Sequence, residues 1–213
     1  METRTRDEMI RACGYLVTRG WVANHDGNVS VKSSPQRFLC TPGATHKGVI
    51  RAQDLLVTDA AGKQLSGRGK TFSEYALHLA VYKSRKDVMA VVHAHPPFAT
   101  ALGASGRELV TFLPEAVVSL GAKVPLVPLA TPGGAAVKAL EPFLAGYDAV
   151  LIAGNGVFAW GDDVEQALMR LELVEHLATI ATHAQAWGGP QPLPQDLTAT
   201  LLEARKKAFP GRG

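Results

Sequence analysis

The tetrapeptide His93-Ala94-His95-Pro96 is the part of the sequence whose residue types and spacing most clearly allow chemistry. Side chains at positions i and i+2 of a β-strand point to the same face, so both imidazoles can converge on one metal ion. The preceding residues 89–92 are apolar and predict a buried strand, which Pro96 ends at a sheet edge. Taken alone, the motif also fits two unrelated histidines at the end of a strand.

Glu74 is the second candidate, because it begins a predicted helix that leads directly into the strand of His93 and His95. From that position its carboxylate can meet an ion or a substrate. Glu74 also completes a capping box with Thr71, in which the carboxylate binds its own helix N-terminus. The sequence pattern does not separate these two hypotheses. His78, one helical turn further on, is expected to pack or lie at the surface rather than to bind an ion.

Two histidines and a carboxylate are a ligand set that suits Zn²⁺, Mn²⁺ or Fe²⁺. Such an ion acts as a Lewis acid that polarises a carbonyl and stabilises an enediolate, while a nearby carboxylate moves protons. This combination serves retro-aldol cleavage, decarboxylation next to a carbonyl, and some isomerisations.

Two glycine-containing loops are candidates for binding the anionic part of a substrate. In residues 26–30, Gly27 permits an unusual backbone conformation and Asn28 offers side-chain hydrogen bonds. Residues 41–48 form a similar loop, and Ser73 lies at a predicted helix N-terminus, which attracts anions. Each loop taken alone is first of all a turn, and anion binding is the second interpretation.

Apolar periodicity predicts the elements that must position these residues. Helices are expected at 3–19, 73–85, 97–104, 115–121, 134–145, 163–187 and 197–208. Strands are expected at 28–32, 37–41, 54–58, 89–95, 124–129, 149–153 and 157–160. No linker or internal repeat divides the chain, so residues 1–213 are expected to form one domain with helices layered on one sheet.

Composition and charge exclude several classes of function. The chain is 46% hydrophobic and 19% charged, which is typical of a globular enzyme, and its formal charge is only +3. It has no stripe of basic residues with interleaved aromatics, so no nucleic-acid partner is expected. No apolar run approaches the roughly 20 residues of a membrane helix. The start is charged, and Cys13 and Cys40 stand outside any CxxC motif, so we expect reduced, buried thiols in a cytoplasmic protein without a membrane partner.

Taken together and in this order, these motifs resemble the class II aldolase/adducin family. The matching stretches are Gly27-Asn28-Val29-Ser30, Thr41-Pro42, His46-Lys47-Gly48, Ser73-Glu74-Tyr75-Ala76-Leu77-His78, Ala90-Val91-Val92-His93-Ala94-His95-Pro96 and the segment 149–176. They spread over residues 5–185, so the resemblance covers nearly the whole chain.

The resemblance implies a three-layer α/β/α fold with a central mixed, largely antiparallel sheet. It also implies a ring-shaped homotetramer with active sites between neighbouring subunits. A divalent metal, usually zinc, is held in the family by three histidines, with a glutamate as ligand or acid/base. His93 and His95 match the first two histidines, and Glu74 matches the glutamate. The positions that hold the substrate phosphate in the sugar-phosphate members correspond to Gly27, Asn28 and Ser73.

The main departure from the family pattern concerns the metal. The third histidine normally stands in a His-Gly pair, which here reads Asn155-Gly156. An amide oxygen is a poorer ligand for zinc than imidazole. Three hypotheses follow: Asn155 is a weak ligand in a retuned active site, the metal relies on Glu74 or another histidine such as His25, or the site is impaired.

Other departures concern the substrate. The family's anion loop has lost one hydroxyl at Gly43-Ala44, and Phe72 replaces the first of two serines before the glutamate. The tyrosine that donates a proton in the sugar-phosphate aldolases is absent near residues 113–115. Glu115 is a substitute for it or simply the start of a helix.

We therefore expect a metal-dependent carbon–carbon lyase, an aldolase of carbohydrate metabolism that acts on a small, phosphorylated hydroxy-ketone. A metal-dependent decarboxylase of a hydroxy- or keto-acid is the alternative enzyme. It is favoured because the phosphate site lacks some of the family's hydroxyl groups. A non-catalytic member that binds or assembles, as the adducin head domain does, is the alternative of another class, and Asn155 supports it.

Overall fold

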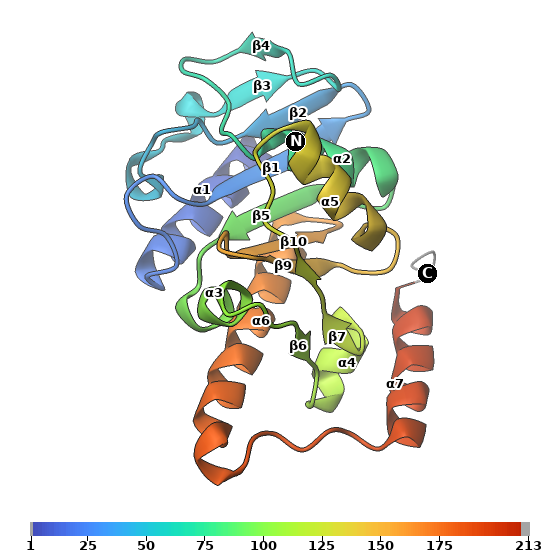
Figure 1. The fold of residues 1–213 in the computed structure, drawn as a ribbon. Coiled ribbons are helices and arrows are strands. Elements are labelled where there is room, and N and C mark those ends of the chain that lie inside the picture. The colour runs from blue at the N-terminus through green and yellow to red at the C-terminus, as the bar shows by residue number, and fades with distance from the viewer. Residues whose placement is uncertain (1, 210–213) are drawn as a thin grey trace.

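The computed structural model describes residues 2–209, which build one eight-stranded sheet with helices packed on both faces (Figure 1). The strands of this sheet are β1 (Asn28–Ser34), β2 (Arg37–Cys40), β3 (Leu56–Thr58), β4 (Gln64–Ser66), β5 (Ala90–Ala94), β8 (Leu126–Val127), β9 (Ala149–Ile152) and β10 (Val157–Gly161). Their order across the sheet is β4-β3-β2-β1-β5-β10-β9-β8. All neighbouring pairs are antiparallel except β8 and β9, so the predicted mixed, largely antiparallel sheet is confirmed.

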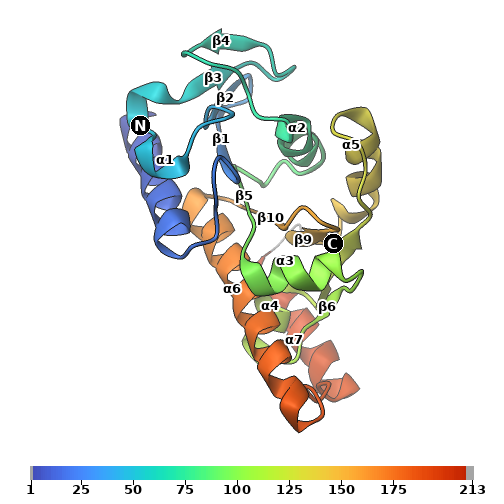
Figure 2. The same ribbon diagram turned by 60° about the vertical axis from the view of Figure 1, so that its left-hand side comes forward.

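Helices cover the sheet in two layers (Figure 2). One layer contains α1 (Glu2–Thr18), α3 (Pro97–Ala104) and α6 (Val164–Ala184), and the other contains α2 (Tyr75–Ser84) and α5 (Gly134–Leu140). At one end of the molecule, α4 (Pro114–Leu120) packs against α7 (Gln195–Ala208), near a small two-stranded ladder of β6 (Leu109–Val110) and β7 (Lys123–Val124). Short 3₁₀ turns occupy Lys47–Val49, Ala52–Asp54, Glu141–Phe143 and Gln185–Trp187. The predicted three-layer fold is therefore confirmed.

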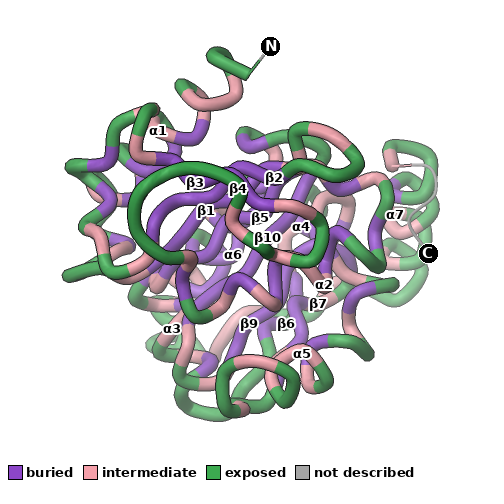
Figure 3. The backbone as a smooth tube through the Cα atoms, turned by 90° about the horizontal axis from the view of Figure 1, so that it is seen from above, coloured by how far each residue is buried: buried purple, intermediate pink, exposed green. Residues whose placement is uncertain are grey.

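The central strand β5 is buried along its whole length, as are its neighbours where they pair with it (Figure 3). Its side chains alternate between two separate cores. Val92 and Ala94 pack in the core under α1 and α6, whereas Val91 packs in the core under α2 and α5. The alternation of side chains along a strand therefore turns His93 toward the α2 layer.

One predicted strand differs in the structure. The segment 124–129 was expected to be continuous, but β7 and β8 are two short strands that belong to different sheets and are separated by Pro125. A proline has no N–H to give to a ladder, so the pairing changes there. The Pro125 carbonyl still accepts a hydrogen bond from Leu151 N, which keeps the chain at the sheet edge.

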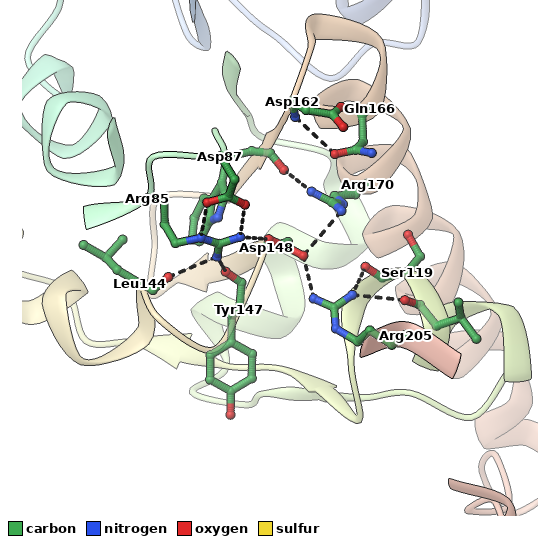
Figure 4. A network of polar contacts seen from close by, with 12 residues as sticks. Arg85, Asp87, Ser119, Leu144, Tyr147, Asp148, Asp162, Gln166, Arg170 and Arg205 are labelled. Carbon is green, nitrogen blue, oxygen red and sulfur yellow. Dashed lines mark hydrogen bonds and ion pairs between the residues drawn. The ribbon is translucent and has the colours of Figure 1, made fainter. Parts of the chain in front are cut away.

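Three arginines surround one buried carboxylate next to the sheet (Figure 4). Asp148 is fully buried immediately before β9. Its carboxylate lies 2.9 Å from Arg85 Nη2, 2.5 Å from Arg205 Nη2 and 3.4 Å from Arg170 Nη2. Arg85 also forms a bidentate pair with Asp87. The network joins α2, β9, α6 and α7, which are far apart in the sequence.

Arg205 ties the last helix to the rest of the molecule. Besides its ion pair with Asp148, it donates hydrogen bonds to the carbonyls of Val118 and Ser119 in α4. Arg205 is almost fully buried, and α7 is otherwise largely exposed. The position of α7 therefore depends strongly on this one guanidinium.

No helix within residues 2–209 is both long enough and apolar enough to cross a membrane. Cys13 and Cys40 are buried and free, and burial raises the pKa of each thiol to about 12. Both thiols are therefore protonated and unreactive near neutral pH.

We predict that Asp148→Asn lowers the free energy of unfolding by about 3–5 kcal/mol, because three buried arginines then lose their shared counter-charge. Urea unfolding of parent and variant measures the loss. Glu203→Gln is the matched control, because Glu203 forms an exposed ion pair with Lys206 and its removal should change little. Equal effects of the two substitutions would contradict the importance of the network.

Candidate active site and metal centre

A cleft of about 620 Å³ lies at the end of β5, where five separate segments of the chain meet. It brings together most of the residues that the sequence singled out for chemistry. They are Gly27, Asn28, Ser73, Glu74, His93, His95 and Asn155. The sheet explains this convergence, because β1 and β10 both pair with β5 and begin where β5 ends.

The strand register sets the neighbours of His93 in the sheet. Asn28 is the direct partner of His93 in the β1–β5 ladder, and Phe158 is its partner in the β10–β5 ladder. The imidazole of His93 stacks on the Phe158 ring with the centroids 4.1 Å apart. His95 follows two residues later, and the centroids of the two imidazoles are 5.0 Å apart.

Both imidazoles direct their Nδ1 atoms at protein acceptors. His93 Nδ1 is 3.0 Å from the Val157 carbonyl, which can only accept, so this nitrogen carries the proton. His95 Nδ1 lies 3.5 Å from a carboxylate oxygen of Asp26. Metal-binding histidines are usually oriented in this way by an acceptor on the second nitrogen. In each ring this leaves Nε2 for a ligand.

The open Nε2 atoms fit a divalent metal. His95 Nε2 is buried and has no hydrogen-bond partner among residues 2–209. His93 is fully buried, and burial, the largest cause, holds its pKa well below the ordinary value of histidine, so the ring is neutral. A neutral imidazole with a free lone pair is the form that binds metals. The two histidines therefore fit Zn²⁺ or a similar ion, bound through His93 and His95.

Glu74 faces the same cleft. Its carboxylate accepts a hydrogen bond of 2.8 Å from Ser73 Oγ and a longer one of 3.5 Å from Asn28 Nδ2. Helix α2 begins one residue later at Tyr75, and Glu74 makes no side-chain capping bond. The capping box with Thr71 is therefore not formed, which leaves the carboxylate available to an ion or a substrate.

Asn155 occupies the third position that the family pattern assigns to a histidine. It lines both the main cleft and a small adjoining pocket, together with Ser73 and Glu74. Within residues 2–209, no group of three His, Cys, Asp or Glu side chains is arranged to hold a metal. His25 is exposed at the rim of the cleft. The possible donors that line the cleft are therefore the two imidazoles, the Glu74 carboxylate and the Asn155 amide.

Two glycines allow the neighbouring strands to approach the end of β5. Gly156 has φ +68°, and a Cβ atom there would lie 2.3 Å from the Ala94 carbonyl oxygen. Gly27 has φ +69°, and a Cβ atom there would lie 2.9 Å from the His93 carbonyl oxygen and 2.5 Å from Val22 Cγ1. No side chain fits in either place, so Asn28 and Asn155 approach the histidines only because a glycine adjoins each of them.

A buried polar cluster lies behind the cleft. His78 is fully buried, as expected for a packing residue, and its Nδ1 is 2.7 Å from Ser30 Oγ, which is 2.8 Å from the Tyr82 hydroxyl. Burial lowers the pKa of His78 to about 3. The ring packs edge-on against Phe158, the residue on which His93 stacks. His78 therefore supports the site from behind as a neutral group.

The segment after the histidines is held by a residue that sequence patterns did not reveal. Glu175 in α6 accepts hydrogen bonds from Phe98 N and Ala99 N, at 3.1 and 2.8 Å, at the start of α3. Its carboxylate is mostly buried, and burial raises its pKa. A carboxylate at a helix N-terminus is favoured by the unpaired amides and the helix dipole. The contact fixes the direction in which the chain leaves His95.

Two further residues near the site were also missed, and one candidate is not in it. Asp26 was noted only as part of a loop, and Lys47 only as part of a matching stretch. Nothing in their local sequence indicates that they lie next to the histidine strand. Glu115 lies exposed in the first turn of α4 and does not line the cleft of its own chain.

The fold and the site define a class of protein. The chain belongs to the class II aldolase and adducin family, because the family model "Class II Aldolase and Adducin N-terminal domain" matches residues 7–182.

Three known members of the family are similar to this chain along most of its length. The chain is 33% identical to a methylthioribulose-1-phosphate dehydratase of Methylococcus capsulatus, over 85% of this chain and 94% of that protein. It is 31% identical to a 3-oxo-tetronate 4-phosphate decarboxylase of Escherichia coli K12, over 84% of this chain and 87% of that protein. The solved structure of an L-fuculose 1-phosphate aldolase superimposes with a TM-score of 0.87 at 26% identity, over 97% of each chain. Relatives of similar likeness thus carry three different reaction names.

We predict that Gly156→Ala destabilises the protein by about 1–3 kcal/mol more than Gly154→Ala does. Both glycines have φ +68°, so both variants carry the same backbone strain, but a Cβ atom at Gly154 meets open space. Chemical unfolding of the two variants measures the difference. If both lose the same stability, the close approach to Ala94 is not what requires glycine at position 156.

We predict that His78 makes the apoprotein sensitive to acid. Its pKa is about 3 in the folded state and about 6.5 in the unfolded chain. The unfolded state therefore binds the extra proton between these values, and stability falls as the pH drops from 7 toward 3.

His78→Gln removes this titration. Between pH 7 and pH 4 the parent should lose about 3 kcal/mol more unfolding free energy than the variant. Urea unfolding at the two pH values measures the difference. Parallel losses in both proteins would show that His78 is already protonated when folded, or neutral in both states.

Proposed function

We propose that this chain is a metal-dependent lyase that cleaves a small, phosphorylated hydroxy-ketone sugar by aldol cleavage. The observation that carries the proposal is that His93 and His95, whose Nδ1 atoms face protein acceptors, line one cleft with the Glu74 carboxylate. His93 and His95 would hold a divalent ion there, zinc in our proposal, and this ion would supply a Lewis acid for the substrate carbonyl.

The residues of the chain then have separate tasks. His93 and His95 would hold the ion, and Asn155 offers an amide oxygen at the third position. Glu74 moves the proton, because its carboxylate faces the cleft and is held in place by Ser73 and Asn28.

The anionic end of the substrate is assigned to one wall of the cleft. Gly27, Asn28 and Ser73 line this wall, and Asn28 Oδ1 and the Ser73 hydroxyl are polar groups within it. The names of all three relatives include a phosphate. Phe72 also lines the wall and adds no hydrogen-bonding group, so the proposed phosphate site is sparse.

A dehydratase is the second candidate, favoured by the 33% identity to methylthioribulose-1-phosphate dehydratase. Dehydration and aldol cleavage both use a polarised carbonyl and a carboxylate that moves a proton, and they differ in the bond that breaks afterwards. Product analysis separates them, because aldol cleavage releases an aldehyde, dehydration releases water, and decarboxylation releases carbon dioxide. We also propose a homotetramer in the cytoplasm, which light scattering and cell fractionation test.

We predict that the purified protein holds about one divalent ion per chain, and that His93→Ala/His95→Ala removes it together with all turnover. Elemental mass spectrometry measures the ion. Trp187→Ala is a control, because Trp187 is highly exposed and does not line the cleft. Unchanged metal content in the double variant would overturn the proposal.

We predict that Asn155→His raises zinc affinity by at least about tenfold, because imidazole is a better zinc ligand than an amide. Competition with a coloured chelator measures the affinity. Asn155→Ala should instead weaken zinc binding. An empty parent that fills only in Asn155→His would show that the site is disabled and would favour a non-catalytic role.

A further inference from the structure

Lys47 is a buried lysine beneath the cleft that the proposed chemistry does not use. Only 3% of it is exposed, although lysine is among the residue types that are least often buried. Burial, the largest cause, lowers the pKa of its ammonium, while the nearby carboxylates of Asp26 and Glu74 act in the opposite direction. Burying an ammonium group is costly, so its surroundings must compensate for the cost.

Two backbone carbonyls compensate for the burial of the Lys47 ammonium. Its Nζ donates hydrogen bonds to the carbonyls of His25, at 3.0 Å, and Thr45, at 2.7 Å. None of the ion pairs formed among residues 2–209 involves Lys47. Its charge is therefore not cancelled by direct contact with a carboxylate.

The two acceptors belong to the two loops that form one wall of the cleft. His25 begins the segment 25–28, which continues through Asp26 to Asn28. Thr45 ends the loop that contains Gly43, which is pressed against the segment 70–72: Gly43 N donates to the Lys70 carbonyl, and a Cβ atom on Gly43 would lie 3.0 Å from the Thr71 carbonyl. Lys47 does not line the cleft itself, so it acts through these loops.

We infer that Lys47 is the positioning residue of the anion-binding wall: it ties the loop of Asn28 to the loop of Gly43 and adds a fixed positive charge behind both. A phosphate monoester is the anion that this wall takes. The inference rests on the proposed function in one respect, namely that the anion is the phosphate of the substrate. A fixed charge in a partly dry site attracts an anion more strongly than one in open water.

The test measures binding of glycerol phosphate, a phosphate monoester without a carbonyl group, to the purified protein by calorimetry. Lys47→Met removes both the charge and the donors, and we expect about tenfold weaker binding. Lys47→Arg keeps both, and we expect binding within about threefold of the parent. Lys83→Met is the matched control, because Lys83 is exposed on α2 away from the cleft, and its binding should equal that of the parent.

Lys47→Gln covers the case in which Lys47→Met does not fold. Glutamine still offers N–H groups to the two carbonyls but carries no charge, and it should also bind glycerol phosphate about tenfold more weakly. A purely structural lysine predicts the opposite pattern, namely a lower melting temperature with unchanged binding. Unchanged binding in a folded Met or Gln variant, or no binding by the parent, overturns the inference.

Turnover assays keep the two proposals separate. A parent that shows no lyase activity but binds glycerol phosphate in a Lys47-dependent way defeats the proposed function and supports the inference. An active parent whose folded Lys47→Met variant keeps its KM defeats the inference alone. If the inference holds, KM for a phosphorylated substrate rises in this variant more than kcat falls.

Discussion

The end of β5 is enclosed on both sides by backbone at a distance that excludes any side chain, and the rest of the site depends on this constraint. Gly27 and Gly156 approach the His93 and Ala94 carbonyls from the two neighbouring strands. Protein interiors do not yield easily to added atoms. The two antiparallel ladders therefore fix where Asn28 and Asn155 can lie. Sheet pairing therefore positions the polar groups at the end of β5, and the loops of residues 25–27, 43–44 and 69–73 complete the cleft around them.

The polar groups around the cleft are divided into those that are satisfied and those that are left open. One nitrogen of His93 is bonded to Val157, and the Glu74 carboxylate is held by Ser73. His95 Nε2 and Asn28 Oδ1, by contrast, are buried without a partner among the described residues. Leaving a buried polar atom without a partner costs about 1–3 kcal/mol, so a ligand that pairs with these two atoms would add stability. This division is typical of sites built for function.

Much of the fold could be predicted because its elements carry clear local patterns. The expected helix at 97–104 coincides with α3, and the expected strand at 28–32 lies within β1. The strand that contains the histidines could be predicted because a run of apolar residues comes before them and a proline follows them. The split at Pro125 and the short strands β4 and β6 were not, since strands of two or three residues have no period to detect.

The candidate site was predicted less completely, for a physical reason. Its residues were found where a local motif or the family resemblance marked them, but their supports come from distant parts of the chain. Glu175 is 76 residues from Ala99, and Lys47 is 22 residues from His25. The Thr71–Glu74 pattern was ambiguous because the carboxylate is shared with Asn28, 46 residues away. Contacts of this range leave no trace in the sequence around either partner.

The Asp148 network also has a consequence for how the protein is made. Arg205 is 57 residues from Asp148, so at about 5–20 residues per second the ribosome adds it roughly 3–11 s later. Until then Asp148 and the carbonyls of Val118 and Ser119 lack their common donor. All strands of the sheet are therefore synthesised before the guanidinium that joins α4 and α7 to Asp148.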